Sequence, residues 1–258
     1  MIALTRKRVY RALLASVVFS VAVNLYFYFF AQAYLEYIVL WAVFFMLVAS
    51  VLAYQNSRML RSAGSLSRVW KLFSAGLLLW AFTNGVSTVY ATLYNRTFPY
   101  FLLLVLLDLV GYLVFIRANF LVSKFTFLIR GDDKGLPVMK ASLVFTVVSL
   151  IALTLFFSYV VITQSYQRFL IVLFLLADAL LAVSLLIPSR ALLNISVKKP
   201  FVLFIGGFVL LLASELSYLL SVYFGLQVPF VGSPQHFLYV AAFGAFALGA
   251  YEQKRVLV

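Results

Sequence analysis

The chain has 258 residues, of which 66% are hydrophobic and 10% charged, and its mean hydropathy is +1.10. Soluble domains carry roughly 25% charged and about 45–50% apolar residues, so this composition excludes a soluble globular fold and indicates a protein whose solvent is the lipid bilayer. The absence of cysteine excludes disulfides and thiolate metal sites, and the single histidine, His236, provides no cluster for zinc.

Long apolar stretches follow one another along the whole sequence. A helix needs about 20 apolar residues to cross the hydrocarbon core, and eight stretches meet that requirement. They cover residues 12–32, 35–55, 69–93, 99–122, 141–163, 168–188, 201–224 and 235–252. The sequence therefore predicts an all-α fold, a polytopic integral membrane bundle of eight transmembrane helices. The first stretch resembles a signal peptide but is longer than the usual run of about 7–15 residues, which favours a retained helix.

The positive charges alternate with the predicted spans. If both termini lie in the cytoplasm, 18 of the 20 Lys and Arg residues fall in inner segments, and only Arg96 and Arg168 fall outside. This bias follows the positive-inside rule, so we expect a multi-pass protein of the cell membrane with cytoplasmic N- and C-termini. The net charge of +13 then indicates anionic lipid headgroups at the inner face as partners. Nucleic acid is excluded, because no basic face with interleaved aromatics lies outside the spans.

The two halves of the chain resemble each other. One constant shift along the sequence aligns Ser57-Arg58 with Ser189-Arg190. A shift shorter by a single position, which we call the repeat offset, then aligns polar, glycine and apolar positions of the later spans: Leu72 with Leu203, Phe73 with Phe204, Gly76 with Gly207, Asn84 with Glu215 and Asp108 with Tyr239. The sequence thus predicts two parallel four-helix repeats, residues 1–132 and 133–258, within one membrane domain. Ligand sites in repeat folds of this kind lie where the repeats meet.

Several polar side chains fall inside the predicted spans. A charged side chain at the bilayer centre costs about 2.5–3.5 kcal/mol on insertion scales, and such residues usually face the bundle interior. We therefore predict a ligand- or proton-binding site, at the midplane or in the outer half of the membrane, among five candidates: Asn24, Asn84, Asp108, Asp178 and Glu215. The alternative is structural, since a neutral buried carboxyl group can hydrogen-bond a neighbouring helix and only hold the bundle together.

Signatures of membrane enzymes are absent from the sequence. It contains no HExxH helix, no GxSxG elbow, no P-loop and no dinucleotide fingerprint, so we expect no enzymatic activity, no metal and no cofactor. The longest cytoplasmic loop, about residues 124–140, contains a turn signal around Asp132 and Asp133. Together with Arg130 and Lys134, this pair forms the candidate contact for a cytoplasmic protein partner.

Residues 70–82 combine Trp70 at a helix start, Gly76 and a second tryptophan, Trp80. This pattern resembles the multi-span membrane sensory regions that precede histidine kinases and diguanylate cyclases, and residues 203–218 have a similar composition. The likeness covers about half of the chain and implies a sensory membrane module. Those regions are attached to an output domain, whereas this sequence holds none.

Three functions remain open at this stage. The first is a non-catalytic sensor or scaffold module that binds a lipid, a small ligand or a protein partner. The second is a secondary transporter, coupled to protons through Asp178, Glu215 or Asp108, although no span is interrupted by proline near its middle. The third is a structural subunit of a larger membrane complex.

Overall fold

The computed structural model describes six long α-helices and one short 3₁₀ turn. The described residues are 2–30, 36–94, 99–130, 176–177, 180–181, 198–223 and 235–257. The elements are α1 Ile2–Phe30, α2 Glu36–Met59, η1 Arg61–Ala63, α3 Ser65–Tyr94, α4 Phe101–Arg130, α7 Lys198–Tyr223 and α8 Gln235–Leu257. Since no strand occurs in these ranges, the described part of the chain is all-helical, as predicted. The predicted span at 141–163 and most of that at 168–188 lie outside these ranges.

Four helices in the described part of the chain are long and apolar enough to cross a membrane. These candidate spans are Val39–Met59, Ser65–Tyr94, Leu103–Lys124 and Lys199–Ser217. They fall in α2, α3, α4 and α7 and match four of the stretches predicted from the sequence. The helices therefore indicate a multi-pass membrane location.

Several helices extend beyond the predicted spans. α4 has 30 residues, or about 45 Å at 1.5 Å per residue, whereas the hydrocarbon core is about 30 Å thick. Arg130, which we expected in a loop beginning near residue 124, is instead the last residue of α4. That boundary was wrong because a helix satisfies its own backbone hydrogen bonds and need not end where the apolar run ends.

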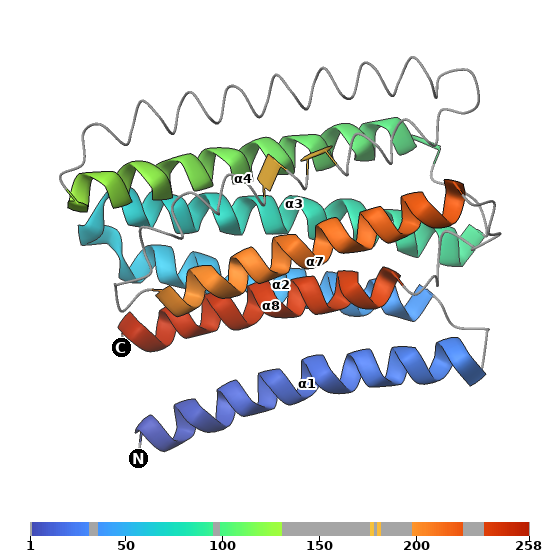
Figure 1. Ribbon diagram of the computed structural model, residues 1–258, viewed down its shortest axis with the longest axis horizontal. Helices are drawn as coiled ribbons and strands as arrows, with labels where there is room; N and C mark the ends of the chain where they lie inside the picture. The colour runs from blue at the N-terminus through green and yellow to red at the C-terminus, as the bar shows by residue number, and fades with distance from the viewer. Residues whose placement is uncertain are drawn as a thin grey trace.

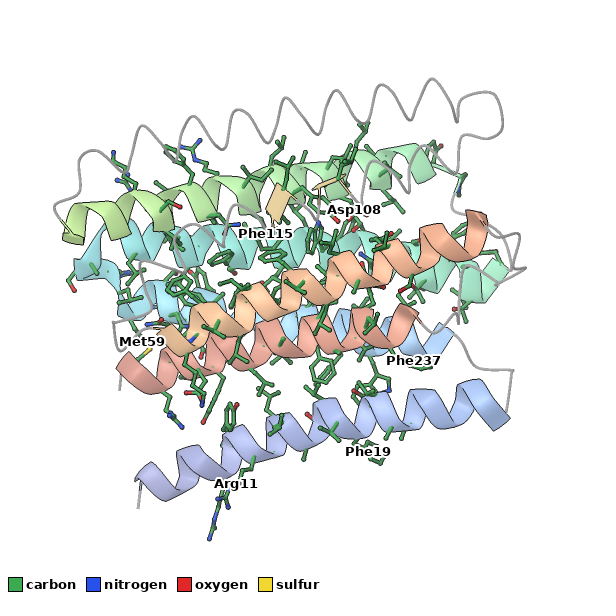
Figure 2. All side chains as sticks on the ribbon, viewed as in Figure 1. Arg11, Phe19, Met59, Asp108, Phe115 and Phe237 are labelled. Carbon is green, nitrogen blue, oxygen red and sulfur yellow. The ribbon has the colours of Figure 1, made fainter. Side chains whose placement is uncertain are left out.

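The helices run side by side, with both chain termini at the same end of the molecule (Figure 1). We call this end the termini end and the other the distal end. α2 packs against α3 and α8, α7 packs against α8, and α4 packs against α3. α1 lies at the edge of the bundle, where it contacts α8 and, more weakly, α2. In Figure 2, Arg11 and Phe19 of α1 point away from the other helices, which suits a helix with one face toward lipid.

The centre of the bundle is filled by aromatic rings from α3, α4, α7 and α8. The rings of Phe73 and Phe204 lie 4.7 Å apart, and those of Phe208 and Phe246 lie 4.8 Å apart. Tilted and edge-to-face contacts of this kind are the favoured geometry for aromatic pairs. We call this set of buried residues the aromatic core: Trp70, Phe73, Trp80, Phe115, Phe204, Phe208, Phe243 and Phe246.

Glycines on the facing helices make room for these rings. A Cβ atom on Gly76 would lie 2.7 Å from the ring of Phe115, and one on Gly207 would overlap the ring of Phe246. Helices in a membrane associate by close packing, because lipid tails are as apolar as the helix surface. The two glycines therefore set how closely α4 approaches α3 and how closely α8 approaches α7.

We predict that Gly207→Ala destabilises the protein by about 1–3 kcal/mol, because the added methyl group overpacks the contact with Phe246 and meets the backbone oxygen of Ala242. The neighbouring Gly206 provides the matched control, since no described atom lies within 4 Å of the position its Cβ would take. Gly206→Ala should be neutral or stabilising by up to about 1 kcal/mol, because alanine favours the helix. Thermal unfolding in detergent measures both, and equal effects would contradict the packing argument.

Candidate functional site

Polar side chains from α3 and α4 meet in the distal half of the bundle. The hydroxyl of Thr83 donates a hydrogen bond to the Asp108 carboxylate, and the indole nitrogen of Trp80 donates to the backbone oxygen of Asp108 at 3.2 Å. Figure 2 shows Asp108 on the distal side of Phe115, far from Met59 at the termini end. Because residues 80, 83 and 84 share one face of α3, the same helix face also presents Asn84 to the interior.

Asn84 links this group to α8. Its side-chain nitrogen donates to the backbone oxygen of Trp80 at 2.9 Å, and its side-chain oxygen accepts a hydrogen bond from the Tyr239 hydroxyl at 3.3 Å. Residues 84 and 239 are far apart in the sequence, so this bond ties the first half of the chain to the second. It leaves both hydrogen-bonding ends of the Asn84 amide engaged.

Glu215 of α7 completes the site. Its carboxyl group lies within electrostatic range of Asp108, and both side chains are half-buried. Two carboxyl groups within electrostatic range of each other inside an apolar bundle attract positive charge. We call these five residues the distal polar cluster: Thr83, Asn84, Asp108, Glu215 and Tyr239.

Aromatic rings lie next to the distal polar cluster, on the side of the termini end. The Trp80 ring is 4.8 Å from Tyr112 and 6.0 Å from Phe243, and the Tyr239 ring meets Phe243 edge-to-face at 4.8 Å. An aromatic face beside carboxylates is a favourable environment for an organic cation. On the side facing the termini end, the aromatic core separates the cluster from the rest of the bundle.

The structure brings together three of the five candidates predicted from the sequence: Asp108, Glu215 and Asn84. Asn24 lies on α1, but its side chain is outside the described residues, as is Asp178. Of the predicted partner loop, Arg130 ends α4, and residues 132–134 lie outside the described ranges. Sequence reasoning overlooked Thr83 and Tyr239 as site residues. The repeat offset had already aligned Tyr239 with Asp108, and that signal was available.

A second charged group lies at the termini end and was also missed. The Glu252 side chain of α8 is only 1% exposed, and it pairs with Lys199 of α7 at 2.8 Å and Arg255 at 3.1 Å. The Lys199 ammonium group lies 5.0 Å from the Tyr10 ring of α1. A buried carboxylate needs such partners, because an unpaired one is strongly destabilising. These contacts connect α1, α7 and α8 at this end of the molecule.

No protein-family model matches the chain, and no curated protein or solved structure is similar enough to count as a match. Within the described residues, no group of three or more His, Asp or Glu side chains could hold a metal ion. The site must therefore be interpreted from its own chemistry. That chemistry consists of two carboxyl groups, an amide and two hydroxyls, with aromatic rings next to them on the side of the termini end.

We predict that Asn84 and Tyr239 stabilise the bundle together. In a double-mutant cycle of Asn84→Ala and Tyr239→Phe, the coupling energy should be about 0.6 kcal/mol, the average for hydrogen bonds between membrane helices. Unfolding in mixed detergent would measure it. Asn84→Ala combined with Tyr251→Phe serves as the control, because Tyr251 lies at the termini end beside Tyr10. A coupling no larger than in this control pair would show that the bond is not formed in the folded protein.

Proposed function

We propose that the protein is a non-catalytic integral membrane module that binds a small cationic ligand or protons at the distal polar cluster and acts as a sensor or scaffold. The single observation that carries this proposal is the hydrogen bond between Asn84 and Tyr239, which joins the two halves of the chain, with Asp108 and Glu215 within electrostatic range of each other beside it. The proposal includes eight transmembrane helices arranged as two four-helix repeats, with the termini end in the cytoplasm.

Equivalent ring contacts support the repeat. Gly76 of α3 faces Phe115 of α4, and Gly207 of α7 faces Phe246 of α8. At the repeat offset, Gly76 aligns with Gly207 and Phe115 aligns with Phe246. The α3–α4 and α7–α8 pairs thus pack with the same glycine-to-ring arrangement.

Contacts between the halves follow the same relationship. The repeat offset exchanges Asn84 with Glu215 and Asp108 with Tyr239. The contact of Asn84 with Tyr239 therefore corresponds to that of Glu215 with Asp108. Phe73 and Phe204, whose rings lie 4.7 Å apart, are each other's counterparts. This pattern suits a pseudo-two-fold axis through the ring pair, with the distal polar cluster at the repeat interface, where membrane folds of this type commonly bind ligands.

The aromatic core favours a sensor over an open conduit. It fills the space between the distal polar cluster and the termini end with buried rings, so a ligand held at Asp108 has no polar route onward through these residues. α7 carries Glu215 in its distal half and Lys199 at its start, where Lys199 pairs with Glu252. A shift of this helix on ligand binding would therefore alter the ion pairs at the termini end.

The charges at the termini end support a cytoplasmic placement and anionic lipid headgroups as partners. Four basic residues are exposed around the connection between α2 and α3. Arg58 lies at the end of α2, Arg61 in η1, and Arg68 and Lys71 in the first two turns of α3. The positive-inside rule places such clusters in the cytoplasm, where each basic residue near the anionic leaflet gains about 1 kcal/mol. A cytoplasmic protein partner would contact the segment from Arg130 to Lys134.

Secondary transport is the second candidate, favoured by the position of the acid pair at the interface of the proposed repeats. In that case protons or a cation would bind between Asp108 and Glu215. Release to the other side would require the aromatic core to separate. In the described helices, proline occurs only in the first turn of α7, at Pro200, so none of them is broken near its middle by proline.

We predict that native mass spectrometry of the protein, extracted with its lipids, detects a retained small molecule that is lost in Asp108→Asn and in Glu215→Gln. The matched control is Glu252→Gln, which makes the same chemical change at the termini end and should keep the molecule. Loss of binding with unchanged thermal stability supports a ligand site. If the ligand survives in the Asp108→Asn, Glu215→Gln double variant, the proposal is wrong.

Proton flux into vesicles separates the two candidates. A transporter should acidify the lumen and lose that flux in Asp108→Asn and Glu215→Gln, whereas a sensor should show no flux in either form. A tightly held protein partner in the mass spectrum, with no small molecule, would instead favour the complex-subunit alternative.

We predict that the ends of α3 lie on opposite sides of the membrane. The chain contains no cysteine, so a single introduced thiol can be labelled without background. Ser62 is exposed in η1, immediately before α3, and Tyr94 is exposed at the end of α3. An impermeant maleimide added to intact cells should label Tyr94→Cys, whereas Ser62→Cys should react only after the membrane is opened. The reverse result would overturn the orientation.

A further inference from the structure

Unpartnered polar groups lie deep in the bundle at the termini end. The side chains of Gln253, Asn56 and Trp70 are all 0% exposed. Neither the oxygen nor the nitrogen of the Gln253 amide has a hydrogen-bond partner among the described residues. The same holds for the side-chain oxygen of Asn56 and the indole nitrogen of Trp70. These groups supply two acceptors and two donors from α2, α3 and α8.

Contacts on either side place Gln253 and Asn56 at the same level. The side-chain nitrogen of Asn56 donates to the backbone oxygen of Ala250 at 2.7 Å, and Gln253 lies three residues further along α8, on the same side of the helix. Gly249, four residues before Gln253, is seated against the backbone oxygen of Pro200 at the start of α7. Gln253 therefore lies on the face of α8 that packs against the end of α2 and the start of α7.

Trp70 of α3 lies near the same level of the bundle. Its ring is 6.1 Å from Phe201 of α7, the residue after Pro200. The hydroxyl of Ser67, one turn earlier on α3, donates to the backbone oxygen of Ser57 at 2.7 Å, and Ser57 is the neighbour of Asn56. The four helices α2, α3, α7 and α8 thus converge around these side chains.

Burial without hydrogen bonds is destabilising for every one of these atoms. Donors and acceptors occur together, so a partner must both donate and accept. The groups come from three different helices. The neighbouring carboxylate, Glu252, already pairs with Lys199 and Arg255 and is not a free partner for them. Buried water fits this requirement, because it typically makes about three hydrogen bonds to polar groups that the protein leaves unmatched.

We propose that Gln253, Asn56 and Trp70 form an internal water-binding site at the termini end of the bundle. Water there accepts from the Trp70 indole and the Gln253 nitrogen, and donates to the Gln253 and Asn56 oxygens. The site bridges α2, α3 and α8 with hydrogen bonds that the side chains do not make directly. With the distal polar cluster on the other side, the rings of the aromatic core other than Trp70 form the dry layer between two polar regions.

Radiolytic hydroxyl labelling tests the site in the full-length protein, because X-rays generate the reagent from water inside the molecule. Trp70 should be labelled although its ring is fully buried, and the label should carry ¹⁸O after the sample is equilibrated in H₂¹⁸O. In Gln253→Met, which keeps the size of the side chain without its amide, labelling of Trp70 should fall several-fold. Gln55→Met is the matched control, since the Gln55 oxygen already accepts a hydrogen bond from Lys254 and its side chain is partly exposed, and it should leave the labelling unchanged.

Thermal unfolding gives a second readout with a definite sign. If water occupies the site, Gln253→Met leaves Asn56 and Trp70 without it, so the melting temperature should fall. If no water contacts the Gln253 amide, replacing its two buried polar atoms, which then lack hydrogen bonds, should raise the melting temperature. An unlabelled Trp70 in the parent protein, or a higher melting temperature for Gln253→Met, would overturn the proposal.

Discussion

The architecture depends on the seating of two aromatic rings against two glycines. Phe115 lies against Gly76, and Phe246 lies against Gly207, which brings α4 close to α3 and α8 close to α7. A membrane supplies little hydrophobic force between helices, so such close packing must provide much of the attraction. With these pairs in contact, the rings of Phe73 and Phe204 meet at the centre of the bundle. The buried polar side chains lie on either side of these rings, toward the distal end and toward the termini end.

The polar groups on either side of the aromatic core differ in character. The distal polar cluster contains two half-buried carboxyl groups, Asp108 and Glu215, with hydroxyl and amide neighbours. At the termini end the buried carboxylate Glu252 already has two cationic partners. An acid whose charge is balanced holds helices together, whereas an acid pair attracts a proton or a cation. This difference is why the proposed ligand site is distal.

Sequence reasoning reached part of this site. Asp108, Glu215 and Asn84 were predicted because polar residues within apolar spans are costly and usually face the interior. Thr83 and Tyr239 were missed because hydroxyl-bearing residues are common in membrane helices and are inexpensive there. Glu252 was missed because it is the last residue of the predicted span 235–252, close to Lys254 and Arg255, where a charge at a helix end is expected. Composition alone does not show that this carboxylate is buried.

Composition and spacing by themselves determined that the chain is helical and apolar enough for a membrane, and where four of its candidate spans lie. The repeat of the two halves stays a prediction. Only the tertiary structure decided which faces meet: that Tyr239 bonds Asn84, that α2 packs on α8, and that Gln253 points inward. The physical reason is that these helices are apolar on nearly every side, so no amphipathic stripe distinguishes the face toward lipid from the face toward another helix.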